Sequence, residues 1–467
     1  MDVASTTATA TATAAIADAD IETVETTDFS ETMASSIDET TERNYRIWKK
    51  NAPFLYDYLS TNSLLWPSLT VQFFPDITHQ SRDRNELLGN ENGFLSTSSE
   101  VVLQRLLHGT FTMGQSVVDS ISILQIPTCT NLKKQIDPEK LNYNQEKEEI
   151  ELNLLQSSQN LKPKVLQKIN QFGDVNKLKY MPQKPNVIAS ANNFGDIVIF
   201  ERTRHKSFQK SIIDDTNVNK AQVCLTNNTS SLSNKKSEIF AMDWNRNKEG
   251  YLLSGDIKGV INLYDLTKYN KSSESLSQEL YWENQSGVND LEWFPTHDSL
   301  FGTGDENGSF KIYDTRVKPL ESTISKTFVD SSINSISINA NFSTALATGD
   351  SKGIIDIWDI RNMSKPISSL TNVHSDAITQ LKWHPKFAQI IASSSSDHSV
   401  KIHDLSRSRH EHSDGSATTI FQHLGHMLGV NDFDWSFADD WMLASVADDN
   451  SLHIWKPCHQ VSKSVAV

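Results

Sequence analysis

The sequence of 467 residues predicts an all-β fold built from repeated four-stranded units, because two series of residues recur along it at a fixed interval. The first series is mostly aromatic and comprises Tyr180, Trp244, Trp293, Ile338, Trp383 and Trp435. Each is followed 20 residues later by a member of the second series: Phe200, Tyr264, Tyr313, Trp358, His403 and Trp455. Successive units lie 64, 49, 45, 45 and 52 residues apart, so rigid modules alternate with connections of variable length.

Each unit has the residue pattern of β-strands. The residues five and two positions before every member of the first series are apolar, as in Val288 and Leu291 before Trp293. The residues three and one positions before every member of the second series are also apolar, and this alternation is typical of a strand. Tight turns are expected at Lys258-Gly259, Asn307-Gly308 and Lys352-Gly353. Four antiparallel strands in about 45 residues, ending on an aromatic residue, predict the blade of a β-propeller.

The region before the six regular units supplies a helix and a seventh blade. Residues 42–60 predict an N-terminal α-helix with two apolar stripes, one at Tyr45, Trp48, Leu55 and Leu59 and the other at Ile47, Phe54 and Tyr58. Pro53 is expected to kink or divide this helix. One stripe would pack on the propeller and leave the other for a partner helix; the alternative is that both stripes are buried.

The predicted propeller occupies residues 61–458. Its seventh, less regular blade is formed by a strand over residues 65–74 and by two β-rich runs over residues 101–126. Insertions are expected at 128–165, 201–236, 269–282 and 407–419, and a C-terminal tail at 459–467. The fold class is thus an all-β, seven-bladed WD-repeat β-propeller with an N-terminal α-helix.

Composition excludes several classes of function. Three cysteines without paired spacing indicate a reducing compartment, and the sequence has no run that is apolar and long enough to span a bilayer. Residues 1–41 predict a disordered, acidic Ala/Thr-rich tail that either attracts cationic partners weakly or is only solvated. Residues 1–42 contain ten acidic residues and no Lys or Arg, which leaves −5 of the net charge of −15 for the rest. Because no basic stripe appears, no direct sequence-specific nucleic-acid binding is expected.

The mouth of the central channel is a candidate binding site for a basic peptide. The residues four positions before the first series are Asn176, Phe240, Asn289, Asn334, Thr379 and Asn431, and those six positions before it include the carboxylates Asp174 and Glu238. Amides both donate and accept hydrogen bonds, and a nearby carboxylate is a charge-assisted partner for Lys or Arg. Capping of strands by local backbone bonds is the alternative role for these Asn residues.

No catalytic constellation is evident. The sequence has neither a Gly-x-Ser-x-Gly elbow nor a Walker loop. His423 and His426 lie three residues apart near Asp432, a spacing that a metal site can use, but hydrogen bonding within the loop is the preferred interpretation. Enzymatic activity, a metal and a cofactor are therefore not expected.

Several stretches resemble the histone-binding WD-repeat proteins related to the retinoblastoma-binding chaperone subunits. They are Tyr45–Tyr58, Trp66-Pro-Ser-Leu-Thr70, Tyr180-Met-Pro-Gln183, Asp298-Ser-Leu-Phe301, Trp358-Asp-Ile-Arg-Asn362 and Gly425–Asp432. The resemblance covers about residues 42–458, and residues 56–62 and 445–457 look closest to the fungal small subunit of chromatin assembly factor 1. It implies a nuclear histone H3/H4-binding scaffold, with a cytoplasmic pool, that acts beside larger assembly subunits in replication-coupled nucleosome assembly.

The resemblance also implies two histone sites. A groove between the N-terminal helix and a late loop would hold the first helix of histone H4, with residues Phe54, Leu55, Tyr58, Leu59, Ile420 and Phe421. The channel face would take the N-terminal tail of histone H3, with matching residues Asp174, Asn176, Glu238, Phe240, Asn334, Asp448 and Asn450. The internal repeats add Asn289 and Asn431 to this face.

Two departures from the family and two other functions qualify this interpretation. The late loop over residues 407–419 has only Glu411 and Asp414 as acids, and it lacks the acidic, double-proline character usual in the family, which weakens the expected H4 site. Asn289, Ala377 and Thr379 stand where acidic or aromatic residues are expected, so weaker H3 binding is expected. The alternatives are a histone-binding subunit of a type B acetyltransferase or deacetylase complex, and a substrate adaptor of a ubiquitin ligase.

Overall fold

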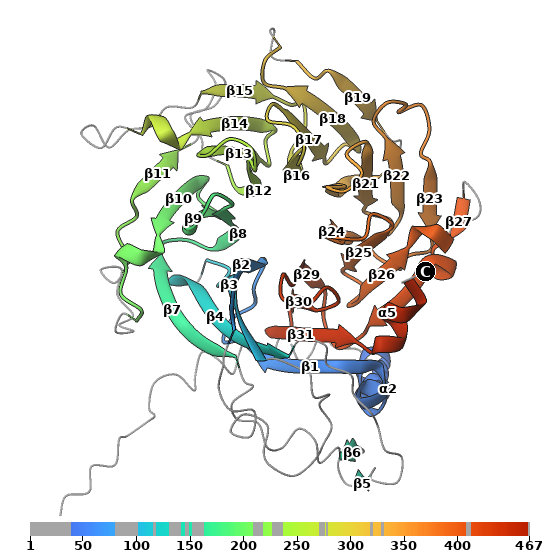
Figure 1. Cartoon of the computed structure of the whole chain (residues 1–467). Coiled ribbons are helices and arrows are strands. Elements are labelled where there is room, and N and C mark those ends of the chain that lie inside the picture. The colour runs from blue at the N-terminus through green and yellow to red at the C-terminus, as the bar shows by residue number, and fades with distance from the viewer. Residues whose placement is uncertain are drawn as a thin grey trace, which may run out of the picture.

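A ring of β-sheets around a central channel forms the body of the molecule (Figure 1). The computed structural model describes residues 39–79, 101–114, 118–129, 142–144, 149–151, 163–208, 218–226, 237–269, 276, 279–317, 321–327, 331–407 and 412–465. Within these ranges, seven sheets of four or five strands make the ring, and β5 and β6 pair with each other separately. The predicted seven-bladed propeller with an N-terminal helix is confirmed.

The blades are numbered by the chain order of their inner strands. The first three contain β2 (Val71–His79), β3 (Val101–Gly109), β4 (Asp119–Cys129) and β7 (Lys164–Gln171); β8 (Val175–Met181), β9 (Lys184–Asn192), β10 (Asp196–Glu201) and β11 (Val223–Thr226); and β12 (Ile239–Trp244), β13 (Tyr251–Asp256), β14 (Val260–Asp265) and β15 (Leu280–Glu283). The fourth contains β16 (Val288–Trp293), β17 (Leu300–Asp305), β18 (Ser309–Asp314) and β19 (Ile324–Thr327).

The fifth blade contains β20 (Ile333–Ile338), β21 (Ala345–Asp350), β22 (Ile355–Asp359) and β23 (Ser368–Thr371), with β27 (His412–Asp414) added in parallel to β23. The sixth contains β24 (Ile378–Trp383), β25 (Ile390–Ser395), β26 (Val400–Asp404) and β28 (Thr419–His423), and the seventh β29 (Val430–Trp435), β30 (Leu443–Ala447), β31 (Ser451–Pro457) and β1 (Tyr56–Ser63). The remaining elements are α2 (Glu39–Leu55), α4 (Gly415–Thr418), α5 (His459–Val465), η3 (Arg202–Arg204), η5 (Leu266–Lys268), η6 (Leu405–Arg407), β5 (Asn142–Asn144) and β6 (Glu149–Glu151).

The ring is closed by the N-terminal part of the chain. Strand β1 is the outermost strand of the seventh blade, and it pairs antiparallel with β31 from Tyr56 opposite Pro457 to Ser63 opposite Ser451. The first blade then begins with β2, which lies beside β29 in the ring. The two ends of the propeller therefore share one blade, so backbone hydrogen bonds rather than a covalent link hold the ring shut.

The helix predicted over residues 42–60 is wrong at both ends. Helix α2 spans Glu39–Leu55, and residues 56–60 belong to β1. Pro53 lies in the last turn of α2, where the structure has one helix rather than two. The open edge of β31 offers Tyr56 and its neighbours a full ladder of backbone partners, and this tertiary pairing overrides the helical periodicity.

The predicted insertions contain parts of the blades. The outer strands β11 and β15 fall within 201–236 and 269–282, the ends of 128–165 belong to β4 and β7, and β27 and α4 fall within 407–419. The predicted C-terminal tail forms α5. Outer strands of four residues are too short to show a hydrophobic periodicity, so they cannot be recognised from the sequence. Residues 1–38 of the predicted acidic tail lie outside the described residues.

The aromatic residues of the two series fill the blades. The side chains of Trp244, Trp293, Trp358 and Trp455 are at most 2% exposed. The exception in the second series is His403, whose Nε2 lies 3.1 Å from Ser393 Oγ. Trp455 Nε1 donates to Ser445 Oγ over the same distance, so His403 replaces the indole as a partner of the strand hydroxyl. Burial holds the pKa of His403 well below its ordinary value, which keeps the ring neutral in this role.

None of the helices that the structure describes has the length and the apolar character needed to cross a membrane.

Deleting residues 1–63 is expected to open the ring. The deletion removes β1 from the edge of β31 and takes the buried Trp48 and Tyr56 from the seventh blade. We expect thermal unfolding followed by circular dichroism to show a loss of at least 10 °C in Tm, because burying two large aromatic side chains alone contributes several kcal/mol. Deleting residues 1–38 is the matched control and should leave Tm unchanged. Equal stability of both truncated chains would contradict closure by β1.

Candidate functional site

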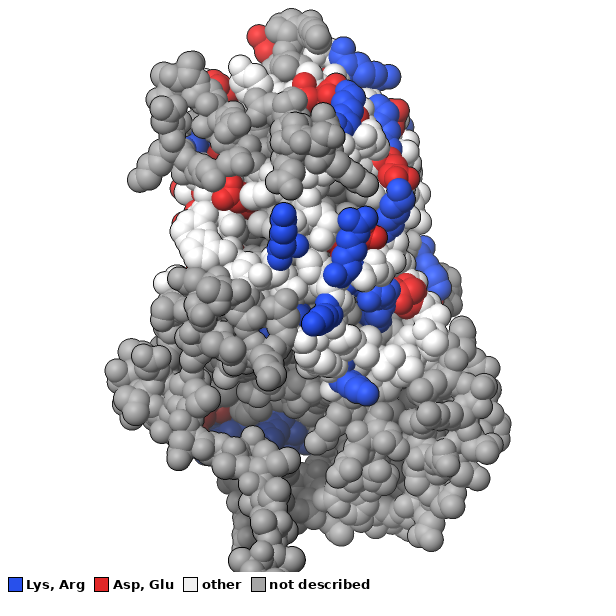
Figure 2. All heavy atoms as spheres, turned by 90° about the vertical axis from the view of Figure 1, so that its left-hand side faces the viewer, with Lys and Arg blue, Asp and Glu red and all other residues white. Residues whose placement is uncertain are grey.

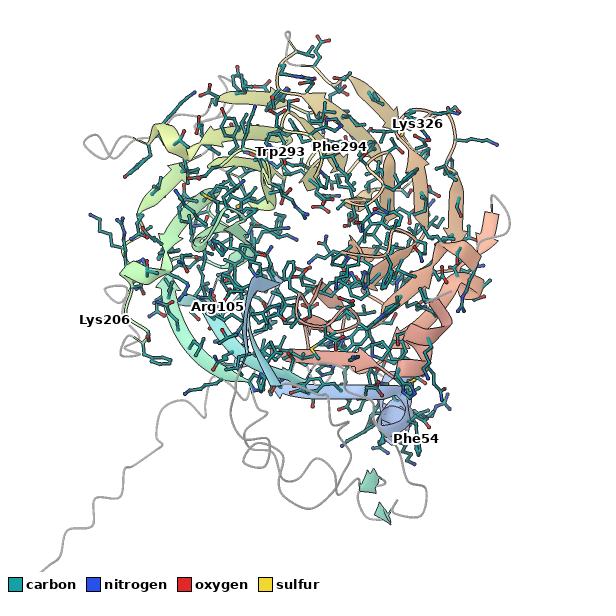
Figure 3. The ribbon with its side chains drawn as sticks, in the orientation of Figure 1. Phe54, Arg105, Lys206, Trp293, Phe294 and Lys326 are labelled. Carbon is teal, nitrogen blue, oxygen red and sulfur yellow. The ribbon has the colours of Figure 1, made fainter. Side chains whose placement is uncertain are left out.

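Helix α2 lies on the outer rim of the last two blades and divides its apolar residues between two faces. Trp48 is 5% exposed, and Tyr45, Ala52 and Leu55 pack around it against the core of the sixth and seventh blades. On the other face, Ile47 and Phe54 are 52% and 43% exposed. Phe54 marks the position of this exposed face on the propeller rim (Figure 3). The division agrees with the expectation that one stripe packs while the other stays available.

The structure separates the six residues predicted for the helix-binding groove. Leu55, Leu59, Ile420 and Phe421 belong to one hydrophobic cluster with Trp48. Phe421 is 7% exposed, because its ring stacks on that of Trp455. Leu55, Leu59 and Ile420 are only partly buried.

Two groove residues do not lie where the sequence analysis placed them. Tyr58 and Leu59 were expected on the helix, but both belong to β1, because the chain leaves the helix at Leu55 to pair with β31. Tyr58 packs in a different cluster, and its hydroxyl donates to the carbonyl of Pro127 at 3.3 Å. Of the six, only Phe54 is exposed on the surface of α2.

A chain of buried hydrogen bonds fixes α2 and β1 to the propeller. Trp48 Nε1 donates to the hydroxyl of Tyr56 at 2.8 Å, and that hydroxyl lies 2.7 Å from Nδ1 of His423. His423 Nε2 lies 3.0 Å from Nδ1 of His453. An indole can only donate, so the Tyr56 hydroxyl accepts from Trp48 and keeps its own proton for donation. With the proton of the neutral His423 ring on Nε2, Tyr56 donates to His423 and His423 donates to His453. Burial lowers the pKa of both histidines well below the ordinary value, in agreement with neutral rings.

The two histidines considered as a metal pair join a third in the folded chain. His423, His426 and His453 are buried, with candidate ligand atoms within 4.8 Å of one another. His426 Nδ1 and Nε2 lie 2.7 Å from Ser451 Oγ and Ser445 Oγ, respectively. Both nitrogens of His423 are also engaged, as described above. These hydrogen bonds occupy the nitrogens that a metal would need, so the site is a hydrogen-bonded cluster.

The amide series at the channel mouth arises from a repeated irregularity of the inner strands. In the six regular blades, the register with the second strand shifts at the residue four positions before the first aromatic series, as between Val288 and Asp290. This residue is the extra residue of a β-bulge, which leaves the ladder and re-aims its side chain. The sequence contained the signal: two core residues spaced by three cannot face the same side of a regular strand.

Most of the bulge side chains bond to the next blade. The amide groups of Asn289 and Asn334 donate to the carbonyls of Ile333 and Ile378, at 3.0 and 3.1 Å. The Thr379 hydroxyl donates to the carbonyl of Val430 at 2.6 Å, and the Asn431 amide to that of Ser68 at 3.2 Å. These bonds join neighbouring blades, so the local strand capping considered for these residues is not their role here.

Asn176 differs from the other bulge residues. Its side chain is only 3% exposed, and neither its amide oxygen nor its amide nitrogen has a hydrogen-bond partner. Leaving a buried amide unpaired costs about 1–3 kcal/mol. Asn176 is therefore a buried bulge residue whose side-chain amide makes no hydrogen bond.

The carboxylates predicted for this face fall into two groups. Asp174 is buried and accepts hydrogen bonds from the backbone and hydroxyl of Thr112 at 3.0 and 3.1 Å and from the Asn193 amide at 3.0 Å, so it holds a loop. Burial, with a contribution from Asp174, raises the pKa of the neighbouring Asp119 to about 7. Glu238 is half-buried.

The remaining residues predicted for this face also differ in their surroundings. Phe240 is 36% exposed at the third blade. Asp448 accepts the amide of Asn431 at 2.7 Å, and burial raises its pKa. Asn450 has a positive φ of 57°, and its buried amide oxygen has no partner. Phe240 is thus the exposed residue of the predicted face, and Glu238 is a half-buried carboxylate two residues before it.

The sequence analysis missed a belt of charged residues in the inner strands below this mouth. Lys382 Nζ lies 3.1 Å from Asp432 and 3.4 Å from Asp434, and Lys179 lies 3.7 Å from Asp243. Burial would raise the pKa of Asp432, but Lys382, Lys177 and the hydrogen bonds to the carboxylate together outweigh burial, so the pKa is lowered. The signal was positional: these residues stand three or one positions before the first aromatic series, opposite the core-facing positions.

Comparisons with known proteins point to one class of partner. A family model described as that of histone-binding protein RBBP4 or of a CAF1-complex subunit matches residues 43–130. A propeller model described as "Nucleolar protein 10-like, N-terminal domain" matches residues 268–454. The chain is 34% identical over 443 residues to histone-binding protein MSI1 of Saccharomyces cerevisiae, and the alignment covers 91% of this chain and 96% of that protein.

Two Asn substitutions should separate the blade-joining amides from the unpaired one. Asn334→Ala removes a bond to the next blade and should lower Tm by about 1–3 °C. Asn176→Leu replaces an unpaired buried amide with an apolar group of similar size and should leave Tm equal or higher. Differential scanning calorimetry checks both. A loss in Asn176→Leu as large as that in Asn334→Ala would show that Asn176 has a partner.

Acid should destabilise the His423 cluster. The pKa of His423 lies well below 6.5, chiefly because the ring is buried and also because of the nearby His426 and His453. As the pH falls through about 6.5, the unfolded chain therefore binds a proton at this residue while the folded chain does not. The free energy of unfolding therefore falls as the pH drops below about 6.5.

The histidine's share of this effect can be measured by substitution. In His423→Gln, the fall in the free energy of unfolding between pH 7 and 5 should be smaller, by at most about 1.4 kcal/mol per pH unit. Denaturant unfolding at several pH values checks this, with the exposed His297→Gln as control. An unchanged slope in His423→Gln would refute the assignment.

Proposed function

This chain belongs to the family of histone-binding protein RBBP4 and its counterpart in the CAF1 complex, and we propose that it binds histones H3 and H4 during replication-coupled nucleosome assembly. It is a histone-binding scaffold in chromatin assembly. The observation that carries the finer proposal is a pair of accessible features at separate places on the molecule. One is the exposed face of α2, with Ile47 and Phe54, and the other is the exposed Phe240 with the half-buried Glu238 at the channel mouth.

The exposed face of α2 supports the binding of an H4 helix. Ile47 and Phe54 present apolar surface on a helix whose opposite face is fixed by Trp48. An amphipathic partner helix would bury them in the helix-in-groove mode of recognition. The partly buried Leu55, Leu59 and Ile420 supply neighbouring apolar contacts in the same cluster. Phe421 supports these contacts from within the core and does not itself meet the histone.

The channel mouth supports the binding of the basic H3 tail. Glu238 offers a carboxylate beside the exposed Phe240, which suits a Lys or Arg side chain through both charge and aromatic contact. Asn176 is unpaired but buried, so it does not itself contact the peptide. Asn289, Asn334 and Asn431 build the rim through their bonds to the next blade.

The proposed setting follows from the family. The chain would work in the nucleus, with a cytoplasmic pool, as a non-catalytic subunit beside larger subunits of an assembly complex. A propeller suits this role because its rim, its two faces and its attached helix are separate surfaces on a rigid body.

The proposal is tested with two variants and two ligands. Phe54→Asp places a charge on the exposed face of α2 and should weaken the binding of an H4 first-helix peptide at least tenfold, because burying an unpaired charge is costly. Fluorescence anisotropy with labelled peptides measures this. Glu238→Gln should instead weaken the binding of an H3 N-terminal peptide about tenfold and leave the H4 peptide unaffected.

The controls separate lost binding from lost folding. Phe342→Asp changes another exposed aromatic residue, 53% exposed on the fifth blade, and should bind both peptides normally. Leu55→Asp is avoided because Leu55 packs against the core. If Phe54→Asp and wild type bind the H4 peptide equally, the helix site is refuted. If both variants lose both peptides, the two-site division fails.

A further inference from the structure

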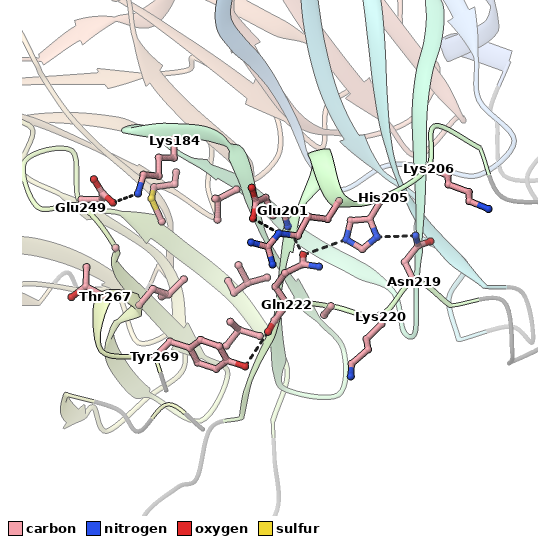
Figure 4. Close-up of a pocket in the computed structure, with 18 of the residues that line it drawn as sticks. Lys184, Glu201, His205, Lys206, Asn219, Lys220, Gln222, Glu249, Thr267 and Tyr269 are labelled. Atoms are coloured by element: carbon pink, nitrogen blue, oxygen red, sulfur yellow. Dashed lines mark hydrogen bonds and ion pairs between the residues drawn. The ribbon is translucent and has the colours of Figure 1, made fainter. Parts of the chain in front are cut away.

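The segment of residues 202–208 on the propeller rim belongs to neither proposed histone site. It follows β10 as the short helix η3 and then passes the outer edge of the first blade, where the backbone N–H of Lys168 on β7 donates to the carbonyl of Ser207 at 2.9 Å. Lys206 and Phe208 line a groove between the second and third blades, and Ser207 between them lies outside that lining (Figure 4). The segment is therefore a surface element of the rim.

The residues before Ser207 form a pattern that occurs once in the chain. The segment reads Arg202-Thr-Arg204-His-Lys-Ser207-Phe208, so an arginine stands three and five positions before the serine, and an aromatic residue follows it. No other Ser or Thr of the sequence has an arginine at both positions, and only Ser364 shares the arginine at three. The pattern therefore distinguishes one hydroxyl group from all others in the chain.

Two arginines at this spacing suit a basophilic protein kinase, which selects substrates with basic residues near the acceptor. In an extended peptide, residues two positions apart project to the same side, so Arg202 and Arg204 can reach one acidic surface together. Guanidinium groups bind carboxylates through charge-assisted, bidentate hydrogen bonds, and kinases select their substrates by such charge patterns. Phe208 adds an apolar contact directly after the acceptor. The sequence around Ser207 thus has the chemistry of a kinase substrate.

The Ser207 hydroxyl is accessible in the folded chain. Ser207 is exposed, and among the described residues its hydroxyl has no hydrogen-bond partner. Ser364 differs, because its hydroxyl donates to the side chain of Asn362 at 2.7 Å. The arginine before it, Arg361, donates from Nε to the carboxylate of Asp359 at 2.9 Å. The structure therefore favours Ser207 over the one other serine that has an arginine at three.

The two arginines are held by surface interactions that a kinase can replace. Arg204 pairs with Glu201 at 2.7 Å, but the two side chains are 58% and 35% exposed, and ion pairs at such exposure contribute little to stability. Arg202 donates from Nε to the side chain of Asn186 at 2.8 Å. An acidic kinase surface offers both guanidinium groups stronger partners than these.

The backbone of the segment is also weakly held. The Gln167 amide donates to the carbonyls of Arg202 and His205 at 2.9 and 3.0 Å, and the His205 ring lies 3.2 and 3.1 Å from the side chains of Gln222 and Asn219 (Figure 4). Helix η3 has no buried residue and no side-chain hydrogen bond at its N-terminus. A surface segment with so few contacts opens locally far more often than the whole chain unfolds, so it can extend into a kinase groove.

The surroundings of Ser207 suit the phosphorylated side chain as well. Lys206 precedes it, and the exposed Lys168 lies across the backbone hydrogen bond. Figure 2 shows Lys and Arg side chains gathered on this side of the molecule. A phosphoserine carries about two negative charges at pH 7 and three acceptor oxygens, which form charge-assisted hydrogen bonds with lysine.

We propose that Ser207 accepts a phosphoryl group from a basophilic protein kinase. The hydroxyl oxygen attacks the γ-phosphorus of Mg·ATP, the bond from that phosphorus to the β,γ-bridging oxygen breaks, and ADP leaves, while an aspartate of the kinase takes the hydroxyl proton. The phosphate offsets most of the positive charge of Arg202, Arg204 and Lys206. Phosphorylation thus changes the charge of a rim segment that lies away from α2 (Figure 1).

Phosphorylation of the purified full-length chain tests the proposal. The chain is incubated with Mg·ATP and the catalytic domain of protein kinase B, a basophilic kinase, and mass spectrometry maps the phosphate. We expect most of the phosphate on Ser207. Ser207→Ala should abolish this labelling, and Arg204→Ala should lower its initial rate at least tenfold, because the variant loses a charged contact with the kinase.

Arg361→Ala is the matched control, since it removes the arginine three positions before Ser364 and should leave the rate unchanged. A peptide of residues 199–211 checks that the kinase accepts the isolated sequence. Labelling of the peptide but not of the folded chain would overturn the proposal, because the fold would then withhold the hydroxyl. The same conclusion would follow from labelling centred on Ser364 or another residue, and from failure of both the chain and the peptide to be labelled.

Discussion

The propeller depends on hydrogen bonds between side chains of one inner strand and the backbone of the next. The carboxylates of Asp290 and Glu292 accept the backbone N–H groups of Ile336 and Ile338, at 3.0 and 2.8 Å. At the junction that closes the ring, Asp432 and Asp434 accept those of Val71 and Phe73, at 3.1 and 2.8 Å. Inner strands of neighbouring blades share no backbone ladder, so these side chains supply the missing acceptors.

Indole N–H groups add a second set of hydrogen bonds between inner strands. Trp244, Trp383 and Trp435 each donate from Nε1 to the carbonyl of an inner-strand residue of the preceding blade: Lys179, Ser337 and Lys382. Three of the four Trp residues in the first series thus combine a large core volume with a hydrogen bond to the preceding blade, whereas the buried Nε1 of Trp293 has no partner in the described part of the chain. The charged residues, the Trp series and the closure of the ring therefore all act through hydrogen bonds between inner strands of neighbouring blades.

This system also prepares the candidate binding surfaces. Because the inner strands are fixed to one another, the bulge residues stand at defined places around the channel mouth, and most of their polar groups are used by the ring itself. In the proposed H3 site, the binding groups are ones that the ring does not use, namely Glu238 and Phe240. The helix face arises in a similar way, since the bonds from Trp48 through Tyr56 to His423 fix one side of α2 and leave Phe54 on the other.

The sequence alone determined the propeller architecture, because constant spacing of aromatic residues is a local pattern that does not depend on distant contacts. The family followed from stretches that resemble it, such as Trp66-Pro-Ser-Leu-Thr70. It also located the bulge series and the two apolar stripes of the helix. Only the tertiary structure decided that Tyr58 and Leu59 lie on a strand, that Phe421 is core, and that the amides join blades. Each of these outcomes depends on a partner far away in the chain, such as β31 for β1 or Ile378 for Asn334.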